Sequence, residues 1–250
     1  MNQGRDKAFR RAVTTVSIVV VVVLAVAVAT LLYLRTTPSR GGVAASLGLA
    51  RGNDASRVAL VIASPAADGA VVAQLVAIVD SSASQNASAA IVDVDPDTKV
   101  AIPGTSFDRL RDAYAFGGGA AVVAALPKPK PQPKPAYVAV PQHVWTAAVD
   151  HSRGVTVTLP ASLDVFDGTR LTSFSAGEQR IQGEGIAALL MGLAHVPATD
   201  RATVRTQLER GIAASLAADA AATEAGVSSD LSRTALHGWL NGSELKSGGR

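Results

Sequence analysis

The sequence predicts an α/β sandwich behind one N-terminal transmembrane helix, and two observations indicate this fold class. Residues 12–34 carry no charge and no proline, and about 20 such residues cross a hydrocarbon core. After residue 57, short apolar runs bounded by turn-forming residues alternate with longer amphipathic stretches, which is typical of strands interleaved with helices. Hydrophobic residues make up 48% of the 250-residue chain and charged residues 17%, which excludes a disordered chain.

The excess positive charge lies at the start of the chain. The formal net charge is +3, and residues 1–11 hold four bases and one acid, so the remainder is neutral. A neutral remainder argues against nucleic acid as a partner, because a nucleic-acid-binding domain normally presents a basic face. Positive charge before the apolar segment predicts a single-pass protein of the cell membrane with a cytoplasmic N-terminus and an extracytoplasmic domain. A cleavable signal peptide is the alternative.

The region after the apolar segment divides into a tether, a domain and a tail. Residues 35–57 are rich in Gly, Ser and Arg and predict a flexible tether. The domain is predicted over residues 58–240, and a flexible tail over residues 241–250. Strands are predicted over residues 58–63, 75–79, 89–94, 100–102, 137–140 and 154–159. Helices are predicted over residues 108–115, 120–126, 142–150, 199–219 and 231–240, and residues 177–193 are expected to begin as a turn and become a helix.

A proline- and lysine-rich segment interrupts the domain. Residues 127–135 read PKPKPQPKP and predict an extended polyproline II rod, because alternate prolines permit neither a helix nor a strand ladder. Its lysines cannot be buried there. The rod could contact an anionic wall polymer or a partner groove that binds polyproline, and a stiff spacer is the alternative.

Several segments of the domain form an ordered set. Residues 91–118 read IVDVDPDTKVAIPGTSFDRLRDAYAFGG, residues 137–184 contain YVAV, VDHSRGVTVTLP and SAGEQRIQGE, and residues 228–240 read SSDLSRTALHGWL. In this order they resemble the LytR–CpsA–Psr (LCP) family of the bacterial envelope. The corresponding family motifs include Ile-Pro-Arg-Asp-Thr, Val-x-Ile-Pro-Gly and Ala-Gly-x-Gln-x-Leu-x-Gly-Glu.

The resemblance implies a fold, a reaction and partners. The fold is an α/β/α sandwich with a mixed central sheet and an apolar groove for a polyprenyl chain. The reaction is the transfer of a glycopolymer from a polyprenyl pyrophosphate carrier onto peptidoglycan. The implied partners are the membrane, a polyprenyl-linked glycan or cell-wall polymer, and active LCP paralogues.

The resemblance also shows where the chain departs from the family. The arginine of Ile-Pro-Arg-Asp-Thr corresponds to Pro96, a later Arg-x-Arg to Met191-Gly192-Leu193, and an early Ser-Asp-Thr to Val72-Ala73-Gln74. Because a phosphate clamp requires positioned cations, the first hypothesis is a catalytically silent protein that binds polyprenyl-linked glycopolymer or acts as a scaffold. The second is an active phosphotransferase with relocated arginines, and only this alternative requires Mg²⁺.

Candidate residues can be named for both hypotheses, although none is assigned as catalytic and no other cofactor or metal is expected. With no cysteine and four histidines that lack metal-ligand spacing, a thiol or His-based metal site has no support. Alternating aspartates at 93, 95 and 97 could surround a cation, but an acidic turn is the favoured interpretation. The glycines at 117–119 indicate a helix stop rather than a phosphate loop.

Candidates for binding the lipid phosphate are Asp97, Thr98, Arg109, Arg111, Arg201 and Arg205. Candidates for the lipid groove are Val72, Val122, Ile186, Leu189 and Leu190, for which a core role is the alternative.

Overall fold

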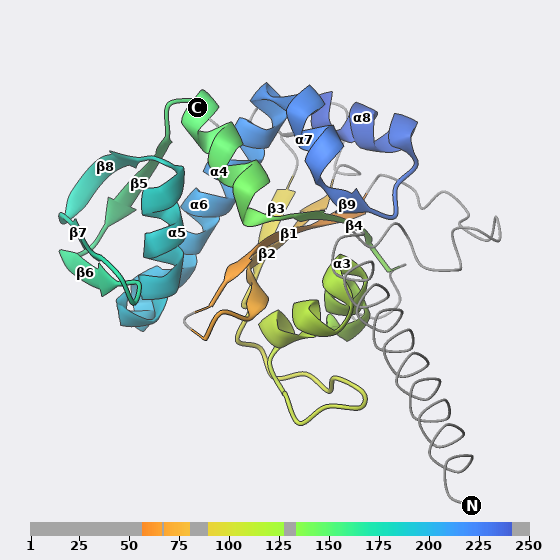
Figure 1. Ribbon diagram of the computed structural model, residues 1–250, viewed down its shortest axis with the longest axis horizontal. Coiled ribbons are helices and arrows are strands. Elements are labelled where there is room, and N and C mark those ends of the chain that lie inside the picture. The colour runs from red at the N-terminus through yellow and green to blue at the C-terminus, as the bar shows by residue number, and fades with distance from the viewer. Residues whose placement is uncertain (1–56, 67, 81–89, 128–133, 242–250) are drawn as a thin grey trace, which may run out of the picture. The chain divides into compact units, whose positions relative to one another are not determined.

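The computed structural model describes residues 57–66, 68–80, 90–127 and 134–241 (Figure 1). The predicted basic arm, transmembrane helix and C-terminal tail lie outside the described residues, as do nearly all of the tether and most of the Pro/Lys rod. Among the helices that the structure does describe, none is both long enough and apolar enough to span a membrane.

A five-stranded sheet forms the centre of the domain, in the order β3-β2-β1-β4-β9. Strand β1 pairs in parallel with β4 and antiparallel with β2, and the β2–β3 and β4–β9 pairs are antiparallel. The mixed central sheet that the family resemblance implies is therefore confirmed. The strands are β1 (Arg57–Pro65), β2 (Val71–Asp80), β3 (Ala90–Val94), β4 (Ala136–Val140) and β9 (Ser228–Ser229).

Strand β1 is buried on both faces, which explains its continuous apolar sequence. Val58, Leu60 and Ile62 belong to the larger apolar cluster of the domain, whereas Ala59 and Val61 belong to the smaller one. Because successive side chains of a strand point to opposite faces of the sheet, the two clusters lie on opposite sides of β1.

Helices pack against each face of the sheet (Figure 1). The larger cluster includes residues from α4 and α6, and α6 buries the predicted stripe of Val204, Leu208, Ile212 and Leu216. The smaller cluster is covered by α3, which follows the short 3₁₀ helix η1. The helices are η1 (Leu110–Asp112), α3 (Ala113–Ala125), α4 (Gln142–His151), α5 (Gly183–Gly192), η2 (Leu193–His195), α6 (Ala198–Ala218), α7 (Ala220–Gly226) and α8 (Arg233–Asn241).

The predicted interruption at the three glycines is confirmed as a kink within α3. Gly118 has φ +60° and ψ −150°, a conformation that residues with a Cβ rarely adopt. Gly119 then allows close packing, because a Cβ added there would lie 2.4 Å from a ring carbon of Tyr137 on β4.

Some local expectations are wrong. Residues 177–181 form strand β8 (Gly177–Ile181) rather than a turn, because they pair antiparallel with β5 (Val155–Leu159). Residues 100–102 form no strand, and only an isolated bridge joins Lys99 to Arg109. The sequence interpretation also missed α7, β9 and the hairpin of β6 (Leu163–Phe166) and β7 (Leu171–Phe174), whose turn contains an Asp-Gly pair.

Candidate functional site

A cavity of about 470 Å³ brings most of the candidate residues together. It lies among the β1–β2 turn, the segment after β3, α3, the end of α5 and the first turns of α6, and we call it the arginine cavity. Its charged lining residues are Asp68, Asp97, Arg111, Asp112, Arg201 and Arg205, and its large apolar lining residues include Val72, Phe107, Phe116, Leu190, Met191 and Leu193.

The turn after β3 sets the position of Asp97. The backbone N–H of Asp97 donates to Asp95 Oδ1 over 3.0 Å, and the N–H of Thr98 donates to the Asp95 carbonyl, also over 3.0 Å. Aspartate and proline suit such a turn, so the interpretation of this segment as an acidic turn is confirmed. The turn carries the Asp97 carboxylate to the wall of the cavity.

Backbone pairing places two arginines beside that carboxylate. Leu110 N–H donates to the Thr98 carbonyl over 2.9 Å, and Arg111 N–H donates to the Pro96 carbonyl over 2.8 Å. Leu110 is fully buried, while Arg109 and Arg111 on either side of it reach the same atom, Asp97 Oδ1, each at 3.3 Å. The alternation of side chains around a buried leucine therefore produces this cluster.

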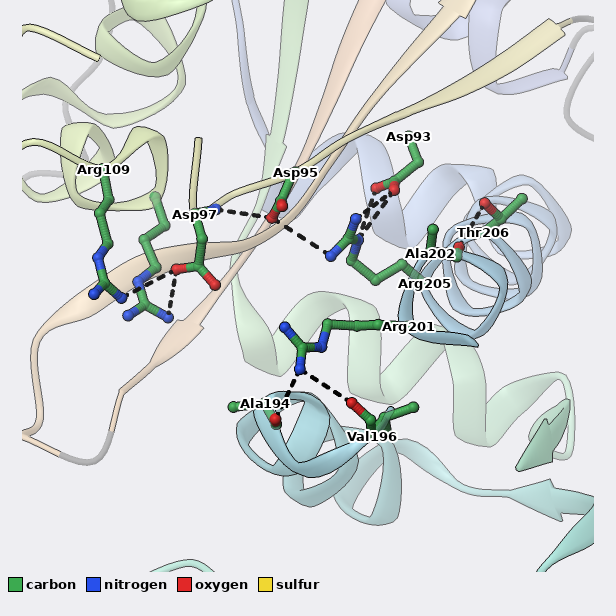
Figure 2. Close-up of polar contacts among 11 residues, drawn as sticks. Asp93, Asp95, Asp97, Arg109, Ala194, Val196, Arg201, Ala202, Arg205 and Thr206 are labelled. Atoms are coloured by element: carbon green, nitrogen blue, oxygen red, sulfur yellow. Dashed lines mark hydrogen bonds and ion pairs between the residues drawn. The ribbon is translucent and has the colours of Figure 1, made fainter. Parts of the chain in front are cut away.

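Helix α6 contributes Arg205, which is paired with aspartates of the same domain. Figure 2 shows the Arg205 guanidinium facing two aspartates that follow one another along β3 and its turn. Arg205 Nη2 donates to Asp93 Oδ2 over 2.8 Å, Nε donates to Asp93 Oδ1 over 3.0 Å, and Nη1 donates to Asp95 Oδ1 over 3.4 Å. Only 7% of Arg205 is exposed. Burial lowers the pKa of Arg205, but its hydrogen bonds to Asp93 and the charges of both aspartates raise that pKa above its ordinary value overall.

A buried carboxyl group lies one helical turn further along α6. Only 1% of Glu209 is exposed. Burial raises the pKa of Glu209 to about 9, with a further contribution from the negative charge of Asp93. Glu209 is therefore protonated and neutral at neutral pH, and it does not compete with Asp93 for Arg205.

Arg201 differs from the other arginines of the cavity. Its Nη2 donates to the carbonyls of Ala194 and Val196, over 2.8 and 3.0 Å (Figure 2). Within the described part of the chain, no carboxylate lies within 4.0 Å of its guanidinium, and its buried Nε has no hydrogen-bond partner. Arg201 is held in place by neutral groups, so its charge stays available to an anion.

The structure separates the predicted residues into those that reach the cavity and those that do not. Of the phosphate candidates, Asp97, Arg111, Arg201 and Arg205 line it, whereas Arg109 only pairs with Asp97 and Thr98 does not line it. Of the groove candidates, Val72 and Leu190 line it. The remaining three, Val122, Ile186 and Leu189, are fully buried in the two apolar clusters.

Sequence reasoning missed two parts of the site. It did not pair Arg205 with Asp93, which lies 112 residues earlier in the chain, and no local pattern signals so distant a partner. It also missed Phe107 and Phe116, which are 53% and 50% exposed with ring centroids 5.4 Å apart. The scarcity of aromatic residues, 4% of the chain, was the available sequence signal, but exposure of these two side chains is not visible in the sequence.

Comparison with known proteins identifies the domain. Residues 73–191 match the model of the LytR_cpsA_psr family, and this span contains β3 and α3 and most of β2 and α5. The resemblance of the domain to the LCP family is therefore confirmed over these residues. That family is associated with cell-wall glycopolymer attachment. No curated protein sequence is significantly similar to the chain.

Solved structures show the same fold. The Lin1025 protein from Listeria innocua is 18% identical over 76% of this chain and 79% of its own, with a TM-score of 0.52. A structure described as TagT bound to LIIa-WTA is 17% identical over 76% and 77%, with a TM-score of 0.51. A LytR-Csp2A-Psr enzyme from Actinomyces oris is 17% identical over 78% and 68%, with a TM-score of 0.50. At these identities the likeness establishes the fold alone.

The positions at which the chain departs from the LCP motifs lie at the cavity. Pro96, Met191 and Leu193, where the resemblance places the LCP arginines, all line it. Val72 and Gln74, in the segment that corresponds to the early Ser-Asp-Thr motif, line it as well. The exchanged positions therefore face the same space, and most of them now present apolar surface.

The carboxylates of Asp93, Asp95 and Asp97 do not fit Mg²⁺ as they are arranged. Mg²⁺ requires oxygen ligands in near-octahedral geometry, whereas Asp93 and Asp95 are hydrogen-bonded to Arg205, and Asp97 is paired with Arg109 and Arg111. A cation bound to these aspartates would lie against guanidinium groups of like charge. Across the described ranges, no group of three or more His, Cys, Asp or Glu residues is placed to hold a metal ion.

Proposed function

We propose that this chain is a catalytically silent LCP protein of cell-envelope glycopolymer assembly, which binds polyprenyl-linked glycopolymer in the arginine cavity without transferring it. One observation carries the proposal. The three positions that correspond to the LCP arginines line the cavity but hold Pro96, Met191 and Leu193. We further propose that the segment 12–34 anchors the domain on the outer face of the cell membrane.

The cavity has two halves that suit such a ligand. Arg201 supplies a positive charge with no carboxylate partner among the described residues, and a lipid phosphate is the anion to match it. Val72, Phe107, Phe116 and Leu190 supply an apolar wall for the prenyl chain. A volume of about 470 Å³ is within the usual range for small-ligand pockets. The fold relative TagT was solved bound to LIIa-WTA, which supports a glycopolymer-linked ligand.

The remaining arginines account for the absence of transfer in this proposal. Phosphoryl transfer requires preorganised charges aimed at the reacting phosphate, and the loss of one such donor lowers the rate by about 10²–10³. Arg205 is committed to a bidentate interaction with Asp93, so it cannot turn to a substrate without leaving a partly buried carboxylate unpaired. Arg111 shares Asp97 with Arg109.

An active phosphotransferase is the second candidate, and Arg201 is the observation that favours it. An arginine with no carboxylate partner among the described residues, at a cavity wall, is compatible with a transferred phosphate as well as with a bound one. In that case Arg111 and Arg201 would replace the missing LCP arginines, and Mg²⁺ would have to displace arginine from at least one aspartate.

Native mass spectrometry of the full chain in a non-ionic detergent, with added polyprenyl phosphate, tests the proposed binding. We expect one bound lipid per chain, about tenfold weaker binding by Arg201→Gln because a charge-assisted hydrogen bond is lost, and unchanged binding by Arg210→Gln on the same helix. The absence of lipid binding by the wild-type chain, beside an LCP protein that does bind it, would refute the proposal.

A further inference from the structure

A second cavity, of about 440 Å³, lies among β5, β8, the turn after α4 and helix α6. We call it the basic groove. Arg210, which lines it, is nine residues beyond Arg201 on α6, and at about 100° per residue the two side chains project from opposite sides of the helix. The polar lining residues of the groove are Ser152, Thr156, Arg180, Gln207, Arg210 and Ser215, and its lining contains no acidic residue.

Arg180 is held in a fixed orientation at the wall of this groove. Its Nε donates to the Arg153 carbonyl over 2.6 Å, and its Nη2 donates to the Ser152 carbonyl over 2.9 Å. These carbonyls belong to a turn in which Arg153 has φ +63° and Gly154 has φ +96°, a backbone shape that a non-glycine residue rarely adopts. A guanidinium fixed in advance loses little freedom when it binds an anion.

The charges of the groove are not neutralised from within the domain. For the part of the chain that the structure describes, no carboxylate lies within 4.0 Å of Arg180 or Arg210. The acidic residue next to Arg210 in sequence is Glu209, which is buried with its pKa raised to about 9, so it carries no charge at neutral pH. The groove therefore keeps two positive charges.

The other polar groups of the groove offer both a donor and acceptors. Gln207 Oε1 accepts the Thr158 N–H over 2.8 Å, which fixes the side chain so that its amide N–H₂ remains available. Ser152 Oγ and Ser215 Oγ lie 2.7 Å apart, and each also contacts a backbone carbonyl. Two hydroxyl protons serve these three contacts, so the pair has no spare donor, but its oxygen lone pairs can accept a hydrogen bond from a ligand hydroxyl.

We propose that the basic groove is a second binding site, which takes a phosphorylated sugar unit. The phosphate lies against the guanidinium of Arg210 and against the Nη1 side of Arg180, whose Nε and Nη2 already donate to backbone carbonyls, because guanidinium N–H groups match phosphate oxygens in charge and geometry. The sugar hydroxyls contact Gln207 and the serine pair. This site is separate from the arginine cavity and contains no apolar wall for a prenyl chain, so it does not depend on lipid binding.

Isothermal titration of the full chain in non-ionic detergent with glucose 1-phosphate tests this site. We expect saturable binding that weakens with salt, is reduced about tenfold by Arg210→Gln, and is reduced further by Ala214→Glu, which adds a negative charge within the groove. Neutral glucose is expected not to bind, and glucuronate shows whether a carboxylate replaces the phosphate. Arg210 is exposed, so its substitution does not threaten folding, and Arg201→Gln is the matched control.

The outcomes separate this site from the proposed function. Equal affinity of the wild type and Arg210→Gln would overturn the inference, as would the absence of saturable binding. Loss of glucose 1-phosphate binding in Arg201→Gln, with Arg210→Gln unaffected, would place the anion in the arginine cavity and overturn it too. Loss in Arg210→Gln would support the groove even if polyprenyl phosphate failed to bind the chain.

Discussion

The two cavities on either side of α6 contain similar groups but differ in how their charges are balanced. The arginine cavity has Arg111 and Arg205 held by the domain's own aspartates, beside a wall of apolar side chains. The basic groove has Arg180 held by backbone carbonyls and Arg210 without a carboxylate partner among the described residues. We therefore expect the groups that hold each guanidinium, and not the number of arginines in a site, to decide its affinity for anions.

The largest expected effect concerns the buried ion pair of the arginine cavity. Arg205→Met removes the cation and leaves Asp93 without its hydrogen-bond donors in a poorly solvated position. We expect the free energy of unfolding to fall by about 3–5 kcal/mol, because breaking a buried pair leaves an uncompensated charge. Chemical denaturation of the full chain in non-ionic detergent, followed by circular dichroism, measures this change. A loss below about 1 kcal/mol would mean that the pair is not buried in solution.

The second prediction concerns the pH dependence of stability. The pKa of Glu209 is raised from 4.5 to about 9 in the folded chain, so between these values the folded state binds one proton more than the unfolded state. Stability should therefore be fully present below about pH 4.5 and fall as the pH rises toward 9, with a slope of up to about 1.4 kcal/mol per pH unit.

The matched variant for this prediction is Glu209→Gln, which has nearly the same shape and cannot ionise. The difference in unfolding free energy between the wild type and the variant isolates the Glu209 term from other titrating groups. If that difference did not change between pH 5 and 9, Glu209 would not be buried in protonated form.

The third prediction compares binding in the two cavities. Arg201→Gln should weaken polyprenyl phosphate about tenfold and leave glucose 1-phosphate unchanged, and Arg210→Gln should do the reverse, since each loses one charge-assisted hydrogen bond to its own anion. Titration of both variants with both ligands measures these opposite effects on affinity. Parallel losses with both ligands would show that one anion site serves both.

The smallest expected effect concerns the exposed pair at the edge of the arginine cavity. Arg109 and Asp97 are each about half exposed and 3.3 Å apart. Arg109→Met should therefore lower the free energy of unfolding by no more than about 1 kcal/mol. Denaturation under the same conditions as for Arg205→Met tests whether burial causes the expected difference in unfolding free energy between the two substitutions.

Periodicity and turn chemistry made much of the fold predictable. The stripe of Val204, Leu208, Ile212 and Leu216 predicted α6, because the spacing of apolar residues on a helix is a local property. Strand β8 was not predictable in this way, since GEQRI has no strand pattern and depends on pairing with β5. Tertiary pairing of this kind overrides local preference.

The candidate site was predictable where charge alternates along a short segment, and not where partners are distant. Arg109, Arg111 and Asp97 lie within one loop, and the resemblance to LCP motifs identified them. The pairing of Arg205 with Asp93 and the ionisation state of Glu209 arise only when α6 packs beside β3. The basic groove gave no sequence signal, because its residues come from three separate segments.

The most direct test of the central claim is the Mg²⁺-dependent transfer or hydrolysis of a polyprenyl pyrophosphate-linked glycan by the full chain in non-ionic detergent. An LCP protein with measured transfer activity is the positive control. The account predicts that this chain binds the lipid and forms no product, because Pro96, Met191 and Leu193, which line the cavity, stand where the resemblance places the LCP arginines. Mg²⁺-dependent product formation that is lost in Arg201→Gln would contradict the account and identify an active enzyme.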